Sequence, residues 1–216
     1  IRPESKLLGK SYNLIDCFYN FPEALLIPDA FFSAEKAVDY LSLVYGDRPD
    51  TVPVFDTVFV QQERRIIAYR IPRPLQEWVY QHFMLARPRH IYSNLLGELF
   101  KRQDIPDQFI KLQVYQTYMV IAVFLQGALQ IVQHYPILSD DDILYRLAAL
   151  RGHYTLDDRQ SVLEISGHFT TGSKLHKLLQ PLFGLIELES AGNSGVFGLT
   201  SPYPPHYFAP YYNLVS

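Results

Sequence analysis

The most constraining feature of this sequence is an unbroken order of secondary-structure signals between residues 110 and 187. Three strand-like apolar segments come first, at 110–117, 118–125 and 128–135, and Gln126-Gly127 supplies a tight hairpin turn between the last two. A helix, a strand, a second helix and a final strand follow. Because an antiparallel meander continues into alternating helices and strands, the segment predicts an α/β fold with a mixed sheet covered on both faces.

The later elements of this segment have clear boundaries. Ser139 opens a helix, and Gly152 ends it. The acidic triplet Asp140-Asp141-Asp142 lies in its first turn, where the positive end of the helix dipole favours carboxylates. A helix cap therefore explains the triplet without a metal ion. Strands are expected at 161–166 and 183–187, with a helix over 172–180 between them.

The first half of the chain shows a similar but less complete alternation. The expected elements are, in order, a strand at 24–28, a helix from Ser33 to Gly46, strands at 54–60 and 65–71, a helix beginning at Pro72 and Pro74, a short strand at His90-Ile91 and a helix over 93–101. The predicted buried face of the helix that follows Pro72 consists of Leu75, Trp78, Val79 and Phe83. A duplicated architecture with two lobes is the simplest interpretation.

Composition shifts divide the chain into three parts. Ile105-Pro106-Asp107 interrupts both periodicities, which predicts an N-terminal lobe over 1–106 and a C-terminal lobe over 107–188. The remaining tail, 189–216, has no charged residue after Glu189 and is rich in proline and aromatic residues. Large aromatic side chains are costly to leave in water, so we expect the tail to lie against the body rather than to serve as a partner motif.

Charge and cysteine content exclude several classes of function. Nineteen Lys and Arg residues against 22 Asp and Glu residues give a net charge of −3, which argues against a nucleic-acid partner. A lone Cys17 excludes a disulfide framework and a cysteine-rich zinc site, and it fits a reducing, cytoplasmic location. The longest dense apolar run, 119–125, is far short of the ~20 residues that a membrane span needs.

A set of apolar and turn motifs extends over most of the chain. It consists of Leu26-Ile27-Pro28, His90-Ile91-Tyr92, Lys111-Leu112-Gln113-Val114-Tyr115, the hairpin from Ala122-Val123-Phe124 to Leu129-Gln130-Ile131, Asp141-Asp142-Ile143-Leu144-Tyr145, Glu164-Ile165-Ser166-Gly167 and Pro205-His206-Tyr207-Phe208. In these motifs the sequence resembles an uncharacterised bacterial domain-of-unknown-function family that is assigned an actin-like ATPase fold. The resemblance implies two ribonuclease H-like lobes, as in the actin, sugar-kinase and Hsp70 superfamily. It implies no activity, since that family has none established.

Active members of this superfamily hold ATP on two phosphate-binding hairpins, each with an aspartate near a glycine-rich turn. When the second-lobe hairpin is aligned by its strand at 121–124, the aspartate position falls on Gln113 and the glycine positions on Tyr115 and Gln116. Gln113 has no charge with which to hold Mg²⁺, and the side chain of Tyr115 would fill the space of a phosphate. The first-lobe hairpin is not recognisable before Leu25.

Gly167 follows the strand at 161–166, in the place of the superfamily glycine beneath the adenosine. Strand-to-helix turns need glycine for backbone reasons as well, so a turn role is expected and cofactor binding is the alternative. The stretch from Gly167 to Lys174 also imitates a Walker A loop, but here Ser173 precedes Lys174. A shift of one residue rotates a helical side chain by ~100°, so we expect a helix start that is not catalytic, with anion binding at its N-terminus left open.

The remaining candidates favour structural roles. The seven histidines lack the spacing of a helical metal site, and we expect surface or hydrogen-bonded core positions, with His168 and His206 the two of most interest. Ser194 lies between glycines but lacks the strand and helix of a nucleophile elbow. The basic clusters Arg64-Arg65 and Arg87-Pro88-Arg89 are expected to be solvated turns.

These observations predict a non-catalytic scaffold or ligand-binding module with degenerate phosphate loops, no cofactor, no metal and an unidentified protein partner. The alternative is a working ATPase or kinase-like enzyme that uses ATP and Mg²⁺, with its first phosphate loop upstream of Ile1 or in the unassigned opening residues. A third interpretation is a structural subunit whose tail or exposed sheet edge mediates association into a homo-oligomer.

Overall fold

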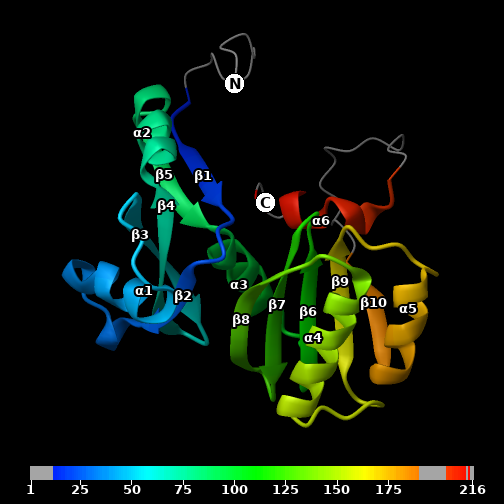
Figure 1. Ribbon diagram of the computed structural model, residues 1–216. Helices are drawn as coiled ribbons and strands as arrows, with labels where there is room; N and C mark the ends of the chain where they lie inside the picture. The colour runs from blue at the N-terminus through cyan, green and yellow to red at the C-terminus, as the bar shows by residue number, and fades with distance from the viewer. Residues whose placement is uncertain (1–11, 190–202, 213, 215–216) are drawn as a thin grey trace. The chain divides into compact units, whose positions relative to one another are not determined.

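The computed structural model describes residues 12–189, 203–212 and 214, and these residues form two compact units (Figure 1). The first unit contains the described residues up to Thr57 together with Ile66–Ile91. The second contains Val58–Arg65 and the described residues from Tyr92 onward. Helix α3 (Ile91–Lys101) therefore belongs almost entirely to the second unit. The lobe boundary predicted at residue 106 would instead assign this helix to the N-terminal lobe.

The second unit is built on a five-stranded mixed sheet with the order β10-β9-β6-β7-β8. Its strands are β6 (Gln108–Val114), β7 (Tyr118–Leu125), β8 (Ala128–Pro136), β9 (Val162–Gly167) and β10 (Leu185–Leu188). Strand β7 runs antiparallel to β6 and β8, while β9 pairs in parallel with β6 and β10. This is the strand order of the ribonuclease H-like unit, and it confirms the predicted mixed sheet.

Helices α4 (Asp140–His153) and α5 (Lys174–Leu179) cover one face of this sheet (Figure 1). The core between helices and sheet contains, among others, Ile110, Leu112, Ile121, Val123, Ile143, Leu147, Leu163, Ile165, Leu175 and Leu179. Each such side chain contributes ~1.5–3 kcal/mol on full burial. Helix α3 packs on the other face, where the Phe100 ring lies 5.5 Å from that of Phe124.

The predicted cap at the start of α4 is confirmed. The Asp142 carboxylate accepts hydrogen bonds from the backbone N–H groups of Leu138 at 2.8 Å and Ser139 at 2.9 Å. These two bonds lower the pKa of Asp142, because they favour its charged form. The acidic triplet thus begins a helix, which continues one residue beyond Gly152 to His153.

A buried ion network lies on the sheet face opposite α4 and α5. Lys111 of β6 is 1% exposed, and its Nζ lies 2.5 Å from Glu164 of β9 and 2.8 Å from Glu189. Arg102 makes a further ion pair with Glu164 at 2.8 Å. Burial alone would raise the pKa of Glu164, but the charges and hydrogen bonds of Lys111 and Arg102 hold it below its usual value. The network joins three segments that are distant in the sequence.

The first unit contains two smaller sheets, except that the turn between β3 and β4 and the adjoining strand ends, Val58–Arg65, belong to the second unit. Strand β1 (Ile15–Tyr19) pairs in parallel with β5 (Ala86–His90). Strands β2 (Ala24–Pro28), β4 (Glu63–Pro72) and β3 (Thr51–Val60) form a three-stranded sheet in that order, with β3 at its edge. Pro53 fits this edge position, since it has no N–H to donate. The described residues of this unit do not form the five-stranded sheet seen in the second.

Two details of the first unit differ from the prediction. Helix α1 (Ala37–Tyr45) begins after a single 3₁₀ turn at Ala34–Lys36, and the Ser33 side chain makes no capping hydrogen bond. In helix α2 (Arg73–His82) only Val79 is buried, while Leu75 is 37% exposed. The small sheets of this unit give α2 less surface to pack against than the larger sheet gives α4. The predicted end of α1 at Gly46 is confirmed.

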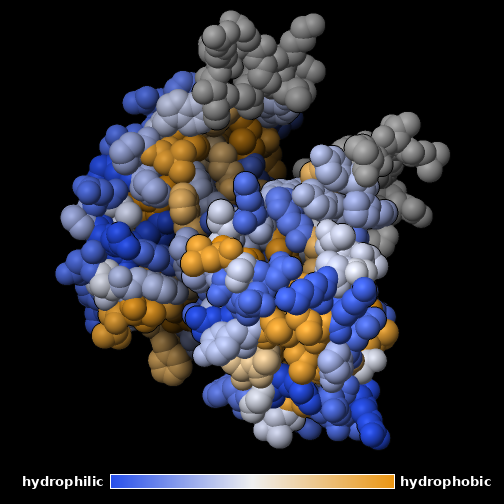
Figure 2. Space-filling view, turned by 45° about the vertical axis from the view of Figure 1, so that its right-hand side comes forward, coloured by the Kyte–Doolittle hydropathy of each residue, from blue (hydrophilic) through white to orange (hydrophobic). Residues whose placement is uncertain are grey.

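The outer surface in the space-filling view is mostly hydrophilic, with separate areas where apolar side chains reach it (Figure 2). No helix in the part of the chain described by the structure is long and apolar enough to cross a membrane.

The buried network predicts a specific dependence of stability on pH. Glu164→Gln should lower the free energy of unfolding at pH 7 by about 2 kcal/mol, because Lys111 and Arg102 lose a buried counter-charge. Because the pKa of Glu164 is lower in the folded state than its ordinary 4.5, its contribution is full above that value and is lost as the pH falls through the folded value. Denaturant melts at neutral and acidic pH should therefore show that acidification lowers the free energy of unfolding less in the variant than in the parent chain.

Glu187→Gln is the matched control, because Glu187 is the exposed register partner of Glu164 on β10. Its effect should stay within about 0.5 kcal/mol at either pH. Equal pH responses of the two variants would contradict this account of Glu164.

Candidate functional site

The three residues that the sequence singled out lie together at the carboxyl ends of β6 and β9. Gln113 is the register partner of Ser166, and Val114 is the partner of Gly167. Tyr115 follows directly and begins the turn between β6 and β7, where its N–H donates to the Tyr118 carbonyl at 2.9 Å. Ligands of open α/β sheets bind outside the carboxyl ends of strands. This edge is therefore the candidate site of the second unit.

Tyr115 is buried inside an aromatic cluster at this turn. Its ring stacks on Tyr118 with centroids 4.7 Å apart and meets Tyr211 edge-on at 5.9 Å. Its hydroxyl donates to the Gln113 side-chain oxygen at 3.2 Å, and only 6% of Tyr115 is exposed. The turn thus holds a phenol and an amide, bonded to each other, at the positions where the alignment expects glycine and aspartate.

Gly167 is required by the close approach of two backbones. Its φ is +88°, and a Cβ atom built on it would lie 2.0 Å from the Val114 carbonyl oxygen. That oxygen also accepts a hydrogen bond from the N–H of His168 at 2.8 Å. A left-handed conformation without space for a side chain leaves glycine as the residue that fits. The backbone conformation at the end of β9 is therefore sufficient to explain why residue 167 is a glycine.

The Walker-like stretch forms the start of a short helix. The Ser173 hydroxyl accepts a hydrogen bond from the N–H of His176 at 3.1 Å, and it caps α5, which has six residues. The N–H of Gly172 donates to the ring Nδ1 of His176 at 2.8 Å, and Lys174 is exposed. The Ser173 hydroxyl therefore caps the helix, whereas the corresponding hydroxyl of a Walker motif binds a metal ion.

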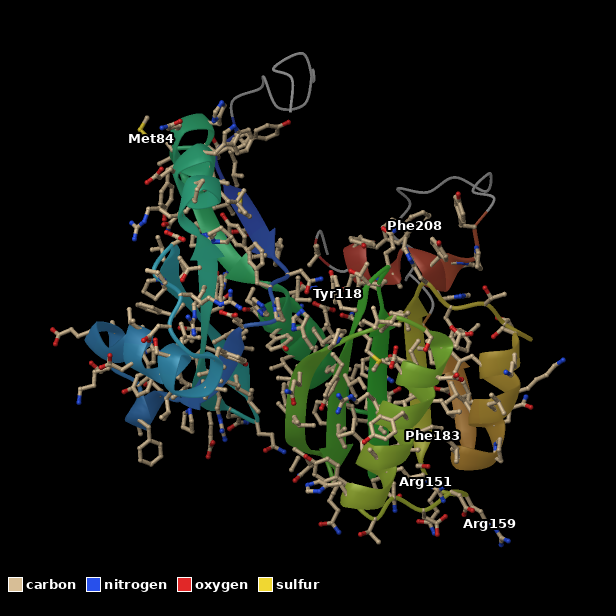
Figure 3. The ribbon with its side chains drawn as sticks, viewed as in Figure 1. Met84, Tyr118, Arg151, Arg159, Phe183 and Phe208 are labelled. Carbon is tan, nitrogen blue, oxygen red and sulfur yellow. The ribbon has the colours of Figure 1, made fainter. Side chains whose placement is uncertain are left out.

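The described residues of the tail lie against the end of β9. The ring Nε2 of His206 is 2.8 Å from the Phe169 carbonyl oxygen, and His206 is only 4% exposed. The rings of His168 and Tyr207 stack at 4.6 Å. Phe208 of the tail and Tyr118 of the hairpin are both at this edge of the sheet (Figure 3). In helix α6 (Ala209–Tyr212) the first two residues are buried.

His134, which is not among the site residues predicted from the sequence, extends the aromatic cluster. Its Nδ1 lies 2.6 Å from the hydroxyl of Tyr92, and both side chains are buried. Its ring lies 5.5 Å from that of Tyr118, which in turn stacks on Tyr115. His134 is the register partner of Val120 on β7. The residues that precede it, Leu129-Gln130-Ile131-Val132-Gln133, do not alternate between apolar and polar types, so no local pattern in the sequence marks it.

Metal-ligand geometry is absent from the described part of the chain, where no three His, Cys, Asp or Glu side chains form a group able to hold a metal ion. The histidines that are buried have structural partners. In the first unit, burial lowers the pKa of His90 to about 4, and its Nε2 lies 3.0 Å from the Phe21 carbonyl oxygen. A neutral imidazole in such a position supports the fold.

Other candidates of the first unit are also structural. Burial, and then the charge of Asp16, raise the pKa of the Cys17 thiol, which disfavours the thiolate. Arg87 does not lie in a solvated turn as predicted. It belongs to β5 and makes two hydrogen bonds to Asp16 of the paired strand β1, at 2.8 and 3.0 Å. Ser194 lies outside the described residues.

Comparison with known proteins identifies both a family and a fold. The family model described as "Protein of unknown function (DUF3822)" matches residues 2–185. A solved Bacteroides thetaiotaomicron protein with an actin-like ATPase fold and unknown function is similar with a TM-score of 0.78 and 16% identity, over 86% of this chain and 72% of that one. The PilM–PilN type IV pilus biogenesis complex is similar with a TM-score of 0.50 and 13% identity, over 88% and 74%.

No curated protein matches the sequence. At these identities the structural similarity shows the fold alone, and it confirms the predicted actin-like ATPase fold.

Gly167→Ala should be strongly destabilising. The new Cβ would collide with the Val114 carbonyl, so we expect a loss of about 3 kcal/mol in the free energy of unfolding. Gly172→Ala is the matched control, because Gly172 also has a positive φ, +77°, but open space around it. Its strain should cost only about 1 kcal/mol. Denaturant melts that rank the two variants equally would contradict the backbone role of Gly167.

His206→Ala should loosen the tail. Removing the ring leaves the Phe169 carbonyl without this partner, and we expect a loss of about 1–2 kcal/mol and faster proteolysis after the tail aromatics. His153→Ala, at the exposed end of α4, is the control and should change neither measurement. If both variants resist protease like the parent chain, the His206 contact does not hold the tail.

Proposed function

The chain belongs to the family described as "Protein of unknown function (DUF3822)", and we propose that it is a non-catalytic module of actin-like fold that binds a partner protein or another ligand without turning over ATP. The proposal rests on the fold, which provides a ligand edge at the carboxyl ends of β6 and β9, and on the side chains found at that edge.

The observation that carries the proposal is the packing of Tyr115. Phosphate binding by a hairpin needs backbone N–H groups open to the ligand, and magnesium needs a carboxylate nearby. Here the Tyr115 ring is enclosed by Tyr118 and Tyr211, and its hydroxyl is bonded to the uncharged Gln113. A triphosphate in this position would have to displace a buried aromatic ring and would meet no carboxylate from Gln113.

The tail supports the same proposal. His206 and Tyr207 rest on the two residues that follow Gly167, which is where the superfamily glycine would lie beneath an adenosine. An adenosine bound beside Gly167 would therefore have to compete with the described tail residues, which supports the proposal.

One of the structurally similar proteins supports the proposal of a protein partner. The PilM–PilN structure is, by its name, a complex of two proteins in type IV pilus biogenesis. A similar fold can therefore act through a bound protein, and we propose that mode for this chain. A cytoplasmic location belongs to the proposal and is supported by the single free cysteine.

The proposal predicts no thermal response to nucleotide. The melting temperature of the full chain should be the same with and without millimolar Mg·ATP, because a ligand that does not bind the folded state cannot stabilise it. Sodium sulfate at equal ionic strength controls for general anion effects. A shift of several degrees with Mg·ATP but not with sulfate would instead support the ATPase alternative.

A further inference from the structure

The described tail residues lie at the edge of the second unit's sheet where ligands of open α/β sheets bind, outside the carboxyl ends of the strands. Ala209 of α6 is fully buried there. Tyr211 of the same helix meets Tyr115, which follows β6, edge-on at 5.9 Å. The tail thus takes the position that a ligand of this unit would have.

Side chains anchor the tail to this edge, as they anchor a bound peptide. The Nε2 of His206 lies 2.8 Å from the Phe169 carbonyl oxygen, and because a carbonyl can only accept, the ring donates. The Tyr207 ring stacks on His168 at 4.6 Å. A backbone hydrogen bond of the tail, from the N–H of Tyr207 to the Pro204 carbonyl at 3.0 Å, instead stays within the segment. The edge therefore recognises a histidine and the aromatic ring that follows it.

The sequence of the tail defines the rest of the chemistry that fits here. No charged residue follows Glu189. Pro204, at φ −64° and ψ 153°, has the conformation of polyproline II, which the proline ring favours before binding. The edge thus accommodates an uncharged segment in which proline precedes the histidine.

The tail uses only part of its aromatic surface at this edge. Tyr203, which stacks on Tyr207 at 5.0 Å, is 51% exposed, and Tyr211 is 47% exposed. Because aromatic rings contribute to binding in proportion to the apolar area that they bury, a segment that covered its rings more completely would bind this edge more tightly.

We infer that this edge is a peptide-binding site, and that the tail occupies it until a partner protein supplies a segment of the same chemistry. The partner segment is uncharged and carries a histidine between a proline and an aromatic residue, as Pro205-His206-Tyr207 does. Its histidine donates to the Phe169 carbonyl, and its aromatic ring stacks on His168. The inference rests on the proposed function and deepens it, because it names the chemistry of the partner and an internal competitor.

A fluorescein-labelled peptide with the sequence of residues 203–212 tests the inference by fluorescence anisotropy with the full chain. A tethered segment competes at an effective concentration of about 1 mM, so the parent chain should bind the peptide weakly. His206→Ala loosens the chain's own tail and leaves the Phe169 carbonyl and His168 in place. This variant should bind the peptide at least about 10-fold more tightly than the parent chain.

Matched controls show whether the histidine is recognised. His153→Ala, at the exposed end of α4, should bind the peptide as the parent chain does. A peptide with alanine in place of its histidine should bind the His206→Ala chain about 10-fold more weakly, since it cannot donate to the Phe169 carbonyl. Tyr207→Ala, which removes the ring stacked on His168, is a second tail variant and decides the outcome if His206→Ala does not fold.

Three results would overturn the inference. They are the absence of peptide binding to both tail variants, equal binding to the parent chain and the tail variants, and equal binding of the two peptides.

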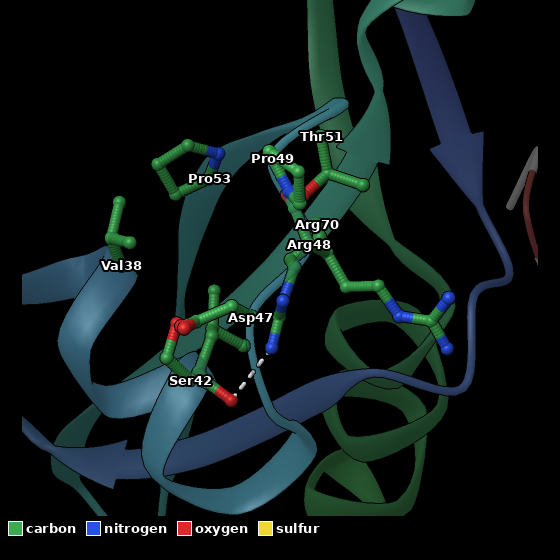
Figure 4. Close-up of a pocket in the computed structure, with 9 residues that line it drawn as sticks. Val38, Ser42, Asp47, Arg48, Pro49, Thr51, Pro53 and Arg70 are labelled. Carbon is green, nitrogen blue, oxygen red and sulfur yellow. Dashed lines mark hydrogen bonds between the residues drawn. The ribbon is translucent and has the colours of Figure 1, made fainter.

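A second concave surface available to an aromatic peptide is a pocket of about 370 Å³ in the first unit, between α1 and strands β3 and β4 (Figure 4). Val38, at 53% exposure, is one of its apolar lining residues. Val38→Trp fills this pocket, and when added to His206→Ala it should leave peptide binding unchanged. His168→Ala added to His206→Ala should instead weaken binding about 3-fold or more, because the stacked ring is lost. The reverse pattern would place the peptide in the pocket and overturn the inference.

Light scattering of the parent chain distinguishes a partner protein from a second copy of this chain. We expect the mass of a monomer over a wide range of concentration. A dimer that His206→Ala abolishes would show that a second copy supplies the segment, and it would overturn the assignment to a different protein. Failed peptide binding without a Mg·ATP shift overturns this inference alone, whereas a Mg·ATP shift in the melting experiment contradicts the proposed function itself.

Discussion

Strands β6 and β9 run parallel at the centre of the second unit's sheet, and their close approach determines much of what surrounds them. The pairing joins the antiparallel meander to the part of the chain that alternates helix and strand. It places Ile110 and Leu112 beside Leu163 and Ile165 in the core under α4 and α5. It also brings two backbones so near at the carboxyl end that Gly167 leaves no space for a side chain. Fold and candidate site thus depend on the same strand pair.

The two faces of this strand pair serve different purposes. The face under α4 and α5 is apolar and accounts for most of the burial. The opposite face carries Lys111, Glu164, Gln113 and Ser166, all buried. Charges removed from water must find partners, and Lys111 finds two carboxylates. Near the carboxyl ends of β6 and β9, the same face is covered by the Gln113 amide, the Tyr115 phenol and aromatic residues of the tail. The Tyr115 hydroxyl donates a hydrogen bond to the Gln113 side chain. The position aligned with the superfamily aspartate therefore holds an amide and not a carboxylate.

The sequence was sufficient to predict the elements that depend on local patterns. The strands of the second unit follow from their apolar segments and from the Gln126-Gly127 turn, and the start of α4 follows from its cap. Gln113, Tyr115 and Gly167 were found by alignment to a superfamily pattern, and the structure brings them together. Contacts across long separations could not be read in this way. Lys111 looks like an exposed residue of a strand until Glu164, 53 positions away, is placed beside it.

The same reason explains the errors in the first unit. Whether the apolar stripe of a helix is buried depends on the surface that packs against it, which the sequence of the helix does not reveal. Leu75 of α2 was predicted to be buried for this reason but is exposed. Arg70 of β4 donates hydrogen bonds to the carbonyl oxygens of Leu41 and Gly46, and these bonds can form only when the end of α1 is folded onto β4.

Pro53 has a consequence for the behaviour of the protein at high concentration. A strand edge offers unpaired backbone groups to any other chain, and such edges start the growth of cross-β aggregates. Pro53 lies on the edge strand β3 and has no N–H, so this strand carries one backbone donor fewer than a strand without proline. Proline is one of the residue types that natural sheets place on exposed edge strands, where it opposes pairing with another chain.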